Sequence, residues 1–363
     1  MNKVHNFSAG PAILPKSAID ASIEALQNFS ETGLSLLEIS HRSKQFEAVV
    51  AEACQLVKEI LTLNDEYEVI FLQGGASLQF DMVPMNFLSP GKTAAYINTG
   101  VWASRAIKEA KLFGDVNLLA SSEDKNFNYI PKNYTIPADA CYFHCTSNNT
   151  IYGTEMFSFP ESPVPVVCDM SSDIFSRKID ASKFDLIYAG AQKNMGPAGA
   201  TLVIIKKSFL EKSNAKVPTM LNYKIHVENG SMYNTPGVFA IFVCMHTLRW
   251  IKSIGLEAME VRNKAKADLL YTEIDRNNLF TGTVVSEDRS RMNVNFVLND
   301  KALEAPFLKL CEERNLSGLK GHRSVGGLRA SLYNALEIDS VQVLVETMQD
   351  FEKANIENLQ SSK

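Results

Sequence analysis

Two patterns of apolar residues alternate along the first 205 positions of the chain. Short apolar runs such as EVIFL at 68–72 are followed by stretches such as 46–61, where apolar residues recur every three or four positions. The first pattern is typical of buried strands and the second of amphipathic helices. Their repeated alternation predicts an α/β fold in which helices wrap a mostly parallel sheet.

The last third of the chain has a different order of elements. A long helix is predicted over 256–276, strand alternation over 291–298, and further helices follow. Helices beside a few strands indicate a small α+β domain. We therefore expect a large domain over 16–255 and a small C-terminal domain over 256–363, with residues 1–15 packed on the small domain.

Composition narrows the class of protein. The 363 residues carry a net charge of −5, which gives no basic footprint for nucleic acid. No apolar run is long enough to span a membrane, and the N-terminus MNKVHNFSAG lacks an apolar signal core. We therefore expect a cytoplasmic protein that binds neither nucleic acid nor membrane.

The six cysteines lie mostly within apolar runs, so buried thiols are expected rather than disulfides. Cys141, His144 and Cys145 are close in sequence, but no second ligand cluster accompanies them. We therefore expect no metal.

The strongest chemical signal is a lysine and an aspartate that each follow a predicted strand. Lys193 follows DLIYAG at 185–190, and Asp169 ends VPVVCD at 164–169, which is 193 − 169 = 24 residues earlier. Such a pair suits pyridoxal phosphate, because the lysine binds the aldehyde and the carboxylate pairs with the protonated ring nitrogen. The alternatives are a surface lysine and an aspartate that caps the next segment.

Other residues with suitable chemistry also fall at predicted strand ends. Gly74-Gly75 lies between a strand and a helix, so backbone N–H groups near Ala76 and Ser77 can bind a phosphate. This turn is not GxGxxG, which disfavours a dinucleotide site. Trp102 can stack on a pyridine ring and the Thr150 hydroxyl can reach the cofactor, although core packing and turn stabilisation are the alternatives. In such sheets, ligands bind beyond the C-terminal ends of the strands.

Four long strings resemble the phosphoserine aminotransferase family, in class V of the fold-type I pyridoxal-phosphate enzymes. They are HNFSAGPAILP at 5–15, VPVVCDMSSDIFSRKID at 164–180, DLIYAGAQKNMGPAG at 185–199 and KGHRSVGGLRASLYNA at 320–335. The resemblance implies a seven-stranded sheet, bound pyridoxal 5'-phosphate and a homodimer with active sites at the subunit interface. It also implies amino transfer between phosphoserine or its keto acid and glutamate or 2-oxoglutarate, in serine biosynthesis. The related 4-phosphohydroxythreonine of pyridoxine biosynthesis is a second candidate substrate.

The resemblance also assigns roles to individual residues. Ser77 departs from the family, which often has a basic residue or cysteine there; this leaves its backbone amide in place. We assign Arg329 to the substrate α-carboxylate, which every substrate shares. The implied cofactor contacts are Ala76, Ser77, Trp102, Thr150, Asp169, Gln192 and Lys193, with Asn234 and Thr235 from the partner subunit. The expected ligands of the distal substrate anion are His41, Arg42, His322 and Arg323, some of them from the partner.

Four other functions remain open from the residues alone. An alanine–glyoxylate aminotransferase is the nearest alternative, and a cysteine desulfurase would need a mobile catalytic cysteine in a Gly/Ser-rich loop, which is not evident. A nicotinamide-dependent oxidoreductase fits the sheet pattern but not the glycine turn. A non-catalytic binding protein would leave Lys193 and Asp169 without a role.

Overall fold

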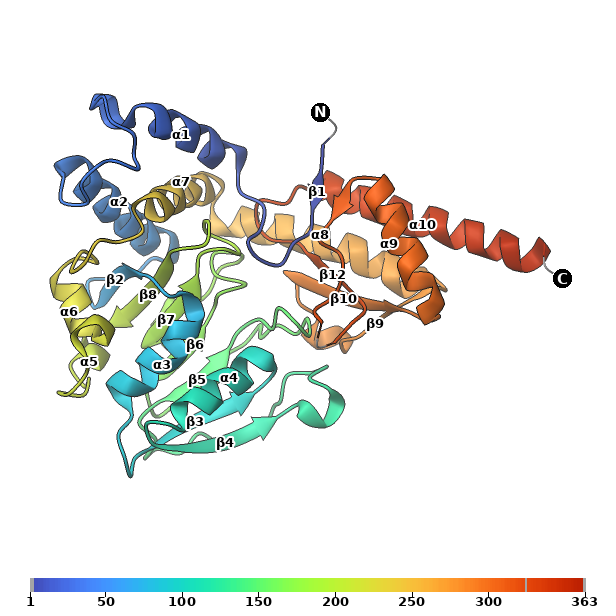
Figure 1. Cartoon of the computed structure of the whole chain (residues 1–363). Coiled ribbons are helices and arrows are strands. Elements are labelled where there is room, and N and C mark those ends of the chain that lie inside the picture. The colour runs from blue at the N-terminus through green and yellow to red at the C-terminus, as the bar shows by residue number, and fades with distance from the viewer. Residues whose placement is uncertain (1–2, 324, 362–363) are drawn as a thin grey trace.

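The computed structural model describes residues 3–323 and 325–361. Figure 1 shows two parts side by side, one built around a large sheet and the other around a small sheet with long helices. The N-terminal segment runs between the two parts before it enters α1 (Lys16–Gln27).

The large part contains a seven-stranded sheet in the order β2-β8-β7-β6-β5-β3-β4. Only β8 runs against its neighbours; the other strands share one direction. The prediction of a mostly parallel seven-stranded sheet is therefore confirmed. The strands are β2 (Tyr67–Leu72), β3 (Thr93–Asn98), β4 (Asp115–Ser121), β5 (Phe143–Thr146), β6 (Val166–Asp169), β7 (Leu186–Gly190) and β8 (Thr201–Lys206).

Helices cover both faces of this sheet, because alternate side chains of the inner strands point to opposite sides. Val69 and Phe71 of β2 belong to one apolar core, whereas Ile70 and Leu72 belong to another. Helices α1, α2 (Lys44–Leu61) and α7 (Val238–Ile254) pack on the first core. The second core is covered by α3 (Gly75–Phe87), α4 (Val101–Ala110), α5 (Lys207–Leu210) and α6 (Tyr223–Glu228).

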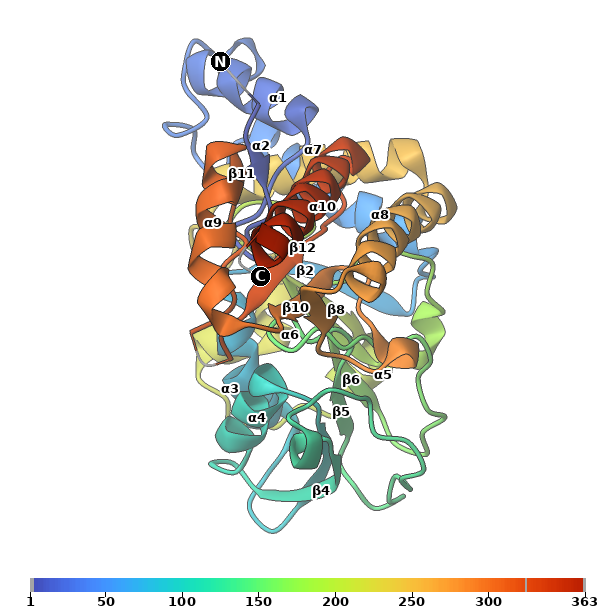
Figure 2. The same cartoon turned by 90° about the vertical axis from the view of Figure 1, so that its right-hand side faces the viewer.

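The smaller part has its own apolar core and a three-stranded antiparallel sheet in the order β12-β10-β9. Its strands are β9 (Phe280–Gly282), β10 (Asn293–Leu298) and β12 (Leu328–Ser331), and its helices are α8 (Leu256–Arg276), α9 (Glu304–Glu313) and α10 (Ile338–Ser361). Figure 2 shows α8, α9 and α10 grouped around the small sheet.

The N-terminal segment is attached to the smaller part. Strand β1 (His5–Asn6) pairs in parallel with β11 (Leu316–Ser317), and Phe7 is buried in the core of that part. These contacts hold residues 5–7 on the smaller part, whereas Leu14 packs against the first core of the large part. The assignment of residues 1–15 to the small domain stays a prediction. The domain limits at 255 and 256 stay a prediction.

Among the described residues, no single helix has the length and apolar composition to cross a membrane. Helices α7 and α8 pass that test only as a pair, and the pair is bent by 91°.

Candidate active site

Lys193 lies in the turn after β7, at the C-terminal end of that strand. Its Nζ donates a hydrogen bond of 2.6 Å to Thr150 Oγ1 and lies 5.6 Å from the centre of the Trp102 ring. Burial, with a smaller contribution from the Arg329 charge, lowers the pKa of Lys193 to about 8, although the Asp169 carboxylate acts in the opposite direction. A neutral amine is therefore accessible near neutral pH, and this is the form that attacks an aldehyde.

Asp169 ends β6, the strand next to β7 in the sheet. The residue is only 4 % exposed, and its Oδ1 accepts a hydrogen bond of 2.9 Å from the Ser171 backbone N–H. Burial raises the pKa of Asp169, while hydrogen bonds from Ser171 and the charge of Lys193 counteract the rise. A buried carboxylate of this kind gains a strong partner when a cationic N–H is placed beside it.

The expected phosphate-binding turn lies between β2 and α3. Gly74 has φ of +91°, and a Cβ there would lie 2.5 Å from Leu78 Cδ2, so only glycine fits without strain. Gly74 supplies no side-chain cap to α3. The first N–H groups of the helix, including those of Ala76 and Ser77, thus have no intrahelical acceptors and suit an anion.

Trp102 and Thr150 approach Lys193 from two different elements. Trp102 lies in the first turn of α4 rather than in a loop, because the helix starts directly after Gly100. A Cβ at Gly100 would lie 2.7 Å from Asn149 Oδ1, so glycine permits the close contact between α4 and the Thr150 loop. The Trp102 Nε1 is buried without a hydrogen-bond partner, as expected for an indole whose site accepts a further group.

The N-terminal segment also forms part of the site. The Ala12 N–H donates to the Gln192 carbonyl at 2.9 Å, and a Cβ at Gly10 would lie 3.4 Å from Lys193 Cγ. Residues from the start of the chain therefore cover one side of Gln192 and Lys193.

Basic residues of the small domain face the same region. Arg329 Nη1 donates to the Thr150 carbonyl at 3.3 Å, whereas its Nε is buried without a partner. Burial lowers the pKa of His322, and the charges of Arg329, Arg323 and Arg105 lower it further. No ion pair within the described ranges involves Arg329 or Arg105, so these cations suit anionic substrate groups.

Comparisons with known proteins identify the family of the chain. The model of the family described as "Aminotransferase class-V" matches residues 4–344. The chain belongs to the class-V aminotransferase family. A phosphoserine aminotransferase from Flavobacterium psychrophilum is 59 % identical over 96 % of this chain and 99 % of its own length. One from Bacteroides fragilis is 57 % identical over 97 % of this chain and 99 % of its own length.

Solved structures of the same family share the fold. The phosphoserine aminotransferase from Bacillus circulans subsp. alkalophilus matches with a TM-score of 0.95 and 45 % identity, over 97 % of this chain and 99 % of that chain. A phosphoserine aminotransferase from Trichomonas vaginalis with bound PLP matches with a TM-score of 0.91 and 38 % identity, over 96 % and 100 %. The predicted α/β fold-type I architecture and the class of enzyme are thereby confirmed.

The residues present fit pyridoxal phosphate, the cofactor of this aminotransferase class. Lys193 offers an amine of lowered pKa, Asp169 a buried carboxylate, and Trp102 an indole with an orphaned N–H. The turn before α3 adds backbone donors for a phosphate. The individual contacts stay predictions.

Two predicted groups are not brought to Lys193 within one chain. His41 and Arg42 lie just before α2, and no hydrogen bond or ion pair among the described residues links them to Lys193. Asn234 and Thr235 precede α7; the Thr235 carbonyl accepts from Gln73 Nε2 at 3.0 Å. Their expected action across a subunit interface stays a prediction.

Two residues of the site, Arg105 and Tyr333, were not predicted from the sequence. The Arg105 guanidinium lies 4.8 Å from the centre of the Trp102 ring; its position three residues after Trp102 on one helix was the available signal. Tyr333 donates to the Ala9 carbonyl at 2.9 Å and accepts from Asn293 Nδ2 at 3.2 Å. Burial raises the pKa of Tyr333 to about 12. No local sequence pattern predicts these contacts of Tyr333, because its partners are distant in sequence.

Proposed function

We propose that this aminotransferase exchanges amino groups between O-phospho-L-serine or 3-phosphohydroxypyruvate and glutamate or 2-oxoglutarate. The observation that carries the proposal is the position of Lys193 and Asp169 at adjacent strand ends, near Arg329 and Arg105, which form no ion pair among the described residues. The names of the relatives at 57–59 % identity support the choice of substrate.

The chain's own residues would hold the cofactor as follows. Lys193 Nζ would bind the aldehyde, the Asp169 carboxylate would pair with the ring nitrogen, and the Trp102 indole would stack on the ring. The N–H groups of Ala76 and Ser77, with Gln192, bind the phosphate. When bound, pyridoxal phosphate supplies an electron sink for the pair released as the substrate Cα–H bond breaks.

Lys193 then acts in proton transfer. With the cofactor bound, the Lys193 Nζ would take the proton from Cα of the amino-acid substrate and would return a proton to the same carbon of the keto acid in the reverse half. A pKa of about 8 suits both directions, because neither protonation state is strongly disfavoured near neutral pH. One site serves both substrates in turn, which gives ping-pong kinetics.

Substrate recognition is assigned to two groups of cations. Arg329 binds the α-carboxylate, since its buried Nε lacks a partner and its Nη1 is already fixed by Thr150. The distal phosphate or carboxylate is bound by His322 and Arg323, and by His41 and Arg42 of a second copy. Guanidinium forks suit both kinds of anion.

The active unit is proposed to be a homodimer in the cytoplasm. Large apolar side chains are exposed on α1 and on the segment between α1 and α2, close in sequence to His41, and they support an interface there. They are Ile19, Ile23, Leu26, Leu34 and Leu37.

A panel of amino acceptors with glutamate as donor tests the proposed substrates. We expect rapid formation of 2-oxoglutarate with 3-phosphohydroxypyruvate and slow formation with glyoxylate or pyruvate. Fast turnover of alanine with glyoxylate, without turnover of the phosphorylated acceptor, would instead establish an alanine–glyoxylate aminotransferase.

A further inference from the structure

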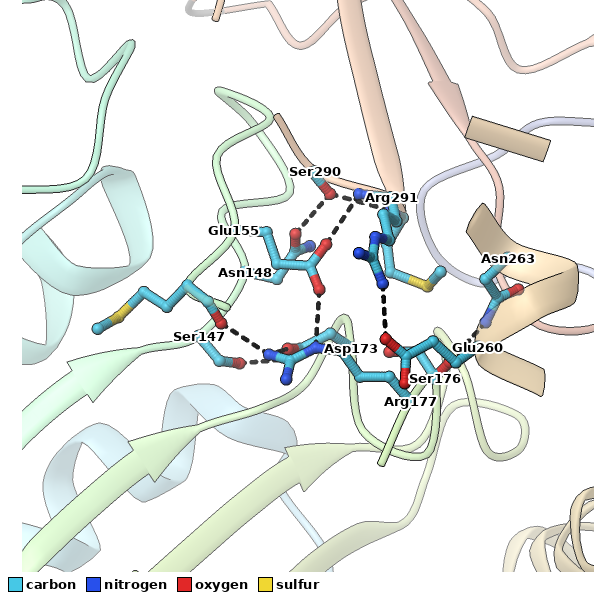
Figure 3. Close-up of polar contacts among 12 residues, drawn as sticks. Ser147, Asn148, Glu155, Asp173, Ser176, Arg177, Glu260, Asn263, Ser290 and Arg291 are labelled. Atoms are coloured by element: carbon cyan, nitrogen blue, oxygen red, sulfur yellow. Dashed lines mark hydrogen bonds and ion pairs between the residues drawn. The ribbon is translucent and has the colours of Figure 1, made fainter. Parts of the chain in front are cut away.

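Asp173 and Arg177, on the segment directly after Asp169, form a buried charge cluster with Glu155, here termed the Arg177 cluster (Figure 3). The three residues are 5 %, 7 % and 1 % exposed, respectively. Arg177 Nε donates to Glu155 Oε1 at 3.1 Å, and its Nη2 lies 3.5 Å from Asp173 Oδ2. The Nη2 also donates to the Met156 carbonyl at 2.7 Å.

Two carboxylates therefore share one guanidinium in this cluster. Glu155 is the better compensated of the two, because its Oε2 also accepts the Arg291 backbone N–H at 2.8 Å. Asp173 has the longer contact with Arg177, and its Oδ1 is bound by the Ser147 hydroxyl in a short hydrogen bond. Negative charge without a partner is costly in such a buried cluster, and Asp173 is the less compensated of the two carboxylates.

Ser147 connects Asp173 to Asp169. Its hydroxyl oxygen lies 3.0 Å from the Asp169 carbonyl oxygen, and its backbone N–H donates to the same carbonyl at 3.0 Å. A serine hydroxyl has a single proton and cannot donate to the Asp169 carbonyl and to an ionised Asp173 together. The charge on Asp173 therefore decides how Ser147 holds the backbone of Asp169.

We propose that Asp173, anchored by Arg177, is a positioning residue for Asp169: its ionised carboxylate takes the single Ser147 hydroxyl proton, so that the Ser147 backbone N–H holds the Asp169 carbonyl. This inference rests on the proposed role of Asp169. It gives a function to a buried carboxylate that the proton transfers assigned to Lys193 do not use.

The charges in this region agree with the proposed role. The negative charge of Asp173 raises the pKa of Lys193, alongside the larger effect of Asp169. Burial, together with the charges of Glu155 and Asp169, raises the pKa of Asp173 to about 7, while Arg177 and the Ser147 hydrogen bond act in the opposite direction. The groups that face Asp173 are thus Arg177, Glu155, Asp169, Lys193 and the neutral Cys168 thiol.

The small domain holds this segment from the other side. Arg291, whose N–H binds Glu155, also donates from Nη1 to Glu260 of α8 at 2.8 Å. Asn263 of α8 donates from Nδ2 to the Ser176 carbonyl at 2.9 Å. The segment that carries Asp173 is therefore fixed between both parts of the molecule, as a positioning role requires.

The test uses Asp173→Asn in the cofactor-loaded protein and follows the pH midpoint of the yellow absorbance of the lysine–cofactor linkage. Removing the negative charge should lower this midpoint by roughly half to one pH unit, since a nearby anion stabilises the protonated linkage. kcat should fall about tenfold, with little change in KM. Ser147→Ala, which leaves the Asp173 carboxyl in place but removes the hydroxyl, should lower kcat and shift the midpoint less than Asp173→Asn does, because the lost hydrogen bond only raises the pKa of Asp173.

Asp288→Asn is the matched control. Asp288 is also a buried carboxylate, but it accepts from the Ile130 N–H at 2.8 Å and has no contact with Asp169 or Lys193 in the described structure. It should lower the melting temperature and leave the midpoint and kcat in place. A midpoint that stays unchanged in Asp173→Asn, with only the melting temperature lowered, would overturn the proposal.

Two further results separate this inference from the proposed function. If Asp173→Asn does not fold, the Ser147→Ala measurement decides, and an unaltered kcat in that variant refutes the link through Ser147. An Asp169→Asn variant with the parental midpoint and kcat would overturn the proposed role of Asp169 itself. A change in Asp169→Asn without any change in Asp173→Asn would overturn only the role of Asp173.

Discussion

The Lys193 amine donates a hydrogen bond of 2.6 Å to the Thr150 hydroxyl, although the two residues are 43 positions apart. The carbonyl of the same threonine accepts from Arg329 at 3.3 Å. Thr150 thus fixes the lysine of the large domain relative to an arginine of the small domain. Thr150 is therefore part of the site because its hydroxyl and its carbonyl each contact a residue of a different domain.

Thr150→Val should slow the capture of pyridoxal phosphate by the cofactor-free protein. The change removes the acceptor that orients Nζ, and one neutral hydrogen bond contributes about 1 kcal/mol, so roughly a fivefold loss is expected. Stopped-flow absorbance measures the rate. Thr150→Ser restores the hydroxyl and should recover most of it; equal losses in both variants would contradict the orienting role.

The rate of cofactor capture should rise with pH through about 8, because the neutral amine of Lys193 is the attacking form. Asp169→Asn should lower this midpoint, since the Asp169 charge raises the pKa of Lys193. The same variant should lose about 3–5 kcal/mol of stabilisation of the cationic ring, which is on the order of 10²–10⁴-fold in single-turnover transamination. Parental single-turnover rates in Asp169→Asn would refute the ring-charge argument.

The sequence predicted those parts of the site that depend on strand ends. Asp169 and Lys193 each follow a continuous apolar run, and the pairing of β6 with β7 brings their strand ends together. Parallel strands with short connections leave few other arrangements, which is why the prediction succeeded.

Residues that meet across the two domains could not be predicted in this way. Asn263 of α8 contacts Ser176, 87 positions away, and Arg329 contacts Thr150, 179 positions away. Such contacts depend on the packing of the small domain, which no local periodicity encodes. The start of α4 also differed from the prediction. Trp102 was expected in the turn after a strand but lies in the first turn of this helix.

Arg329→Ala should weaken phosphoserine, glutamate and alanine alike, because all three carry an α-carboxylate. The expected loss in kcat/KM is on the order of 2–5 kcal/mol for a desolvated charge pair.

Arg42→Ala and Arg323→Ala should instead affect phosphoserine far more than alanine, whose side chain has no anion. Equal losses on alanine and phosphoserine in Arg42→Ala would contradict the distal-anion role.

Hybrid dimers test whether each site uses two subunits. Lys193→Ala subunits and Asn234→Ala/Thr235→Ala subunits should each be inactive as homodimers. Mixing them should restore activity, because one site in each hybrid contains both intact groups. Hybrids shown to form, by differently tagged subunits, but without any activity would place both groups in one subunit's site.

The central claim is that Lys193 is the residue that binds the cofactor aldehyde. Borohydride reduction of the yellow protein, followed by proteolysis and peptide mass spectrometry, tests it directly. We predict loss of the yellow colour and a pyridoxyl adduct on Lys193 alone. The Lys193→Ala protein should show neither the colour nor the adduct. An adduct on another lysine, or a Lys193→Ala protein that keeps its reducible colour, would contradict it.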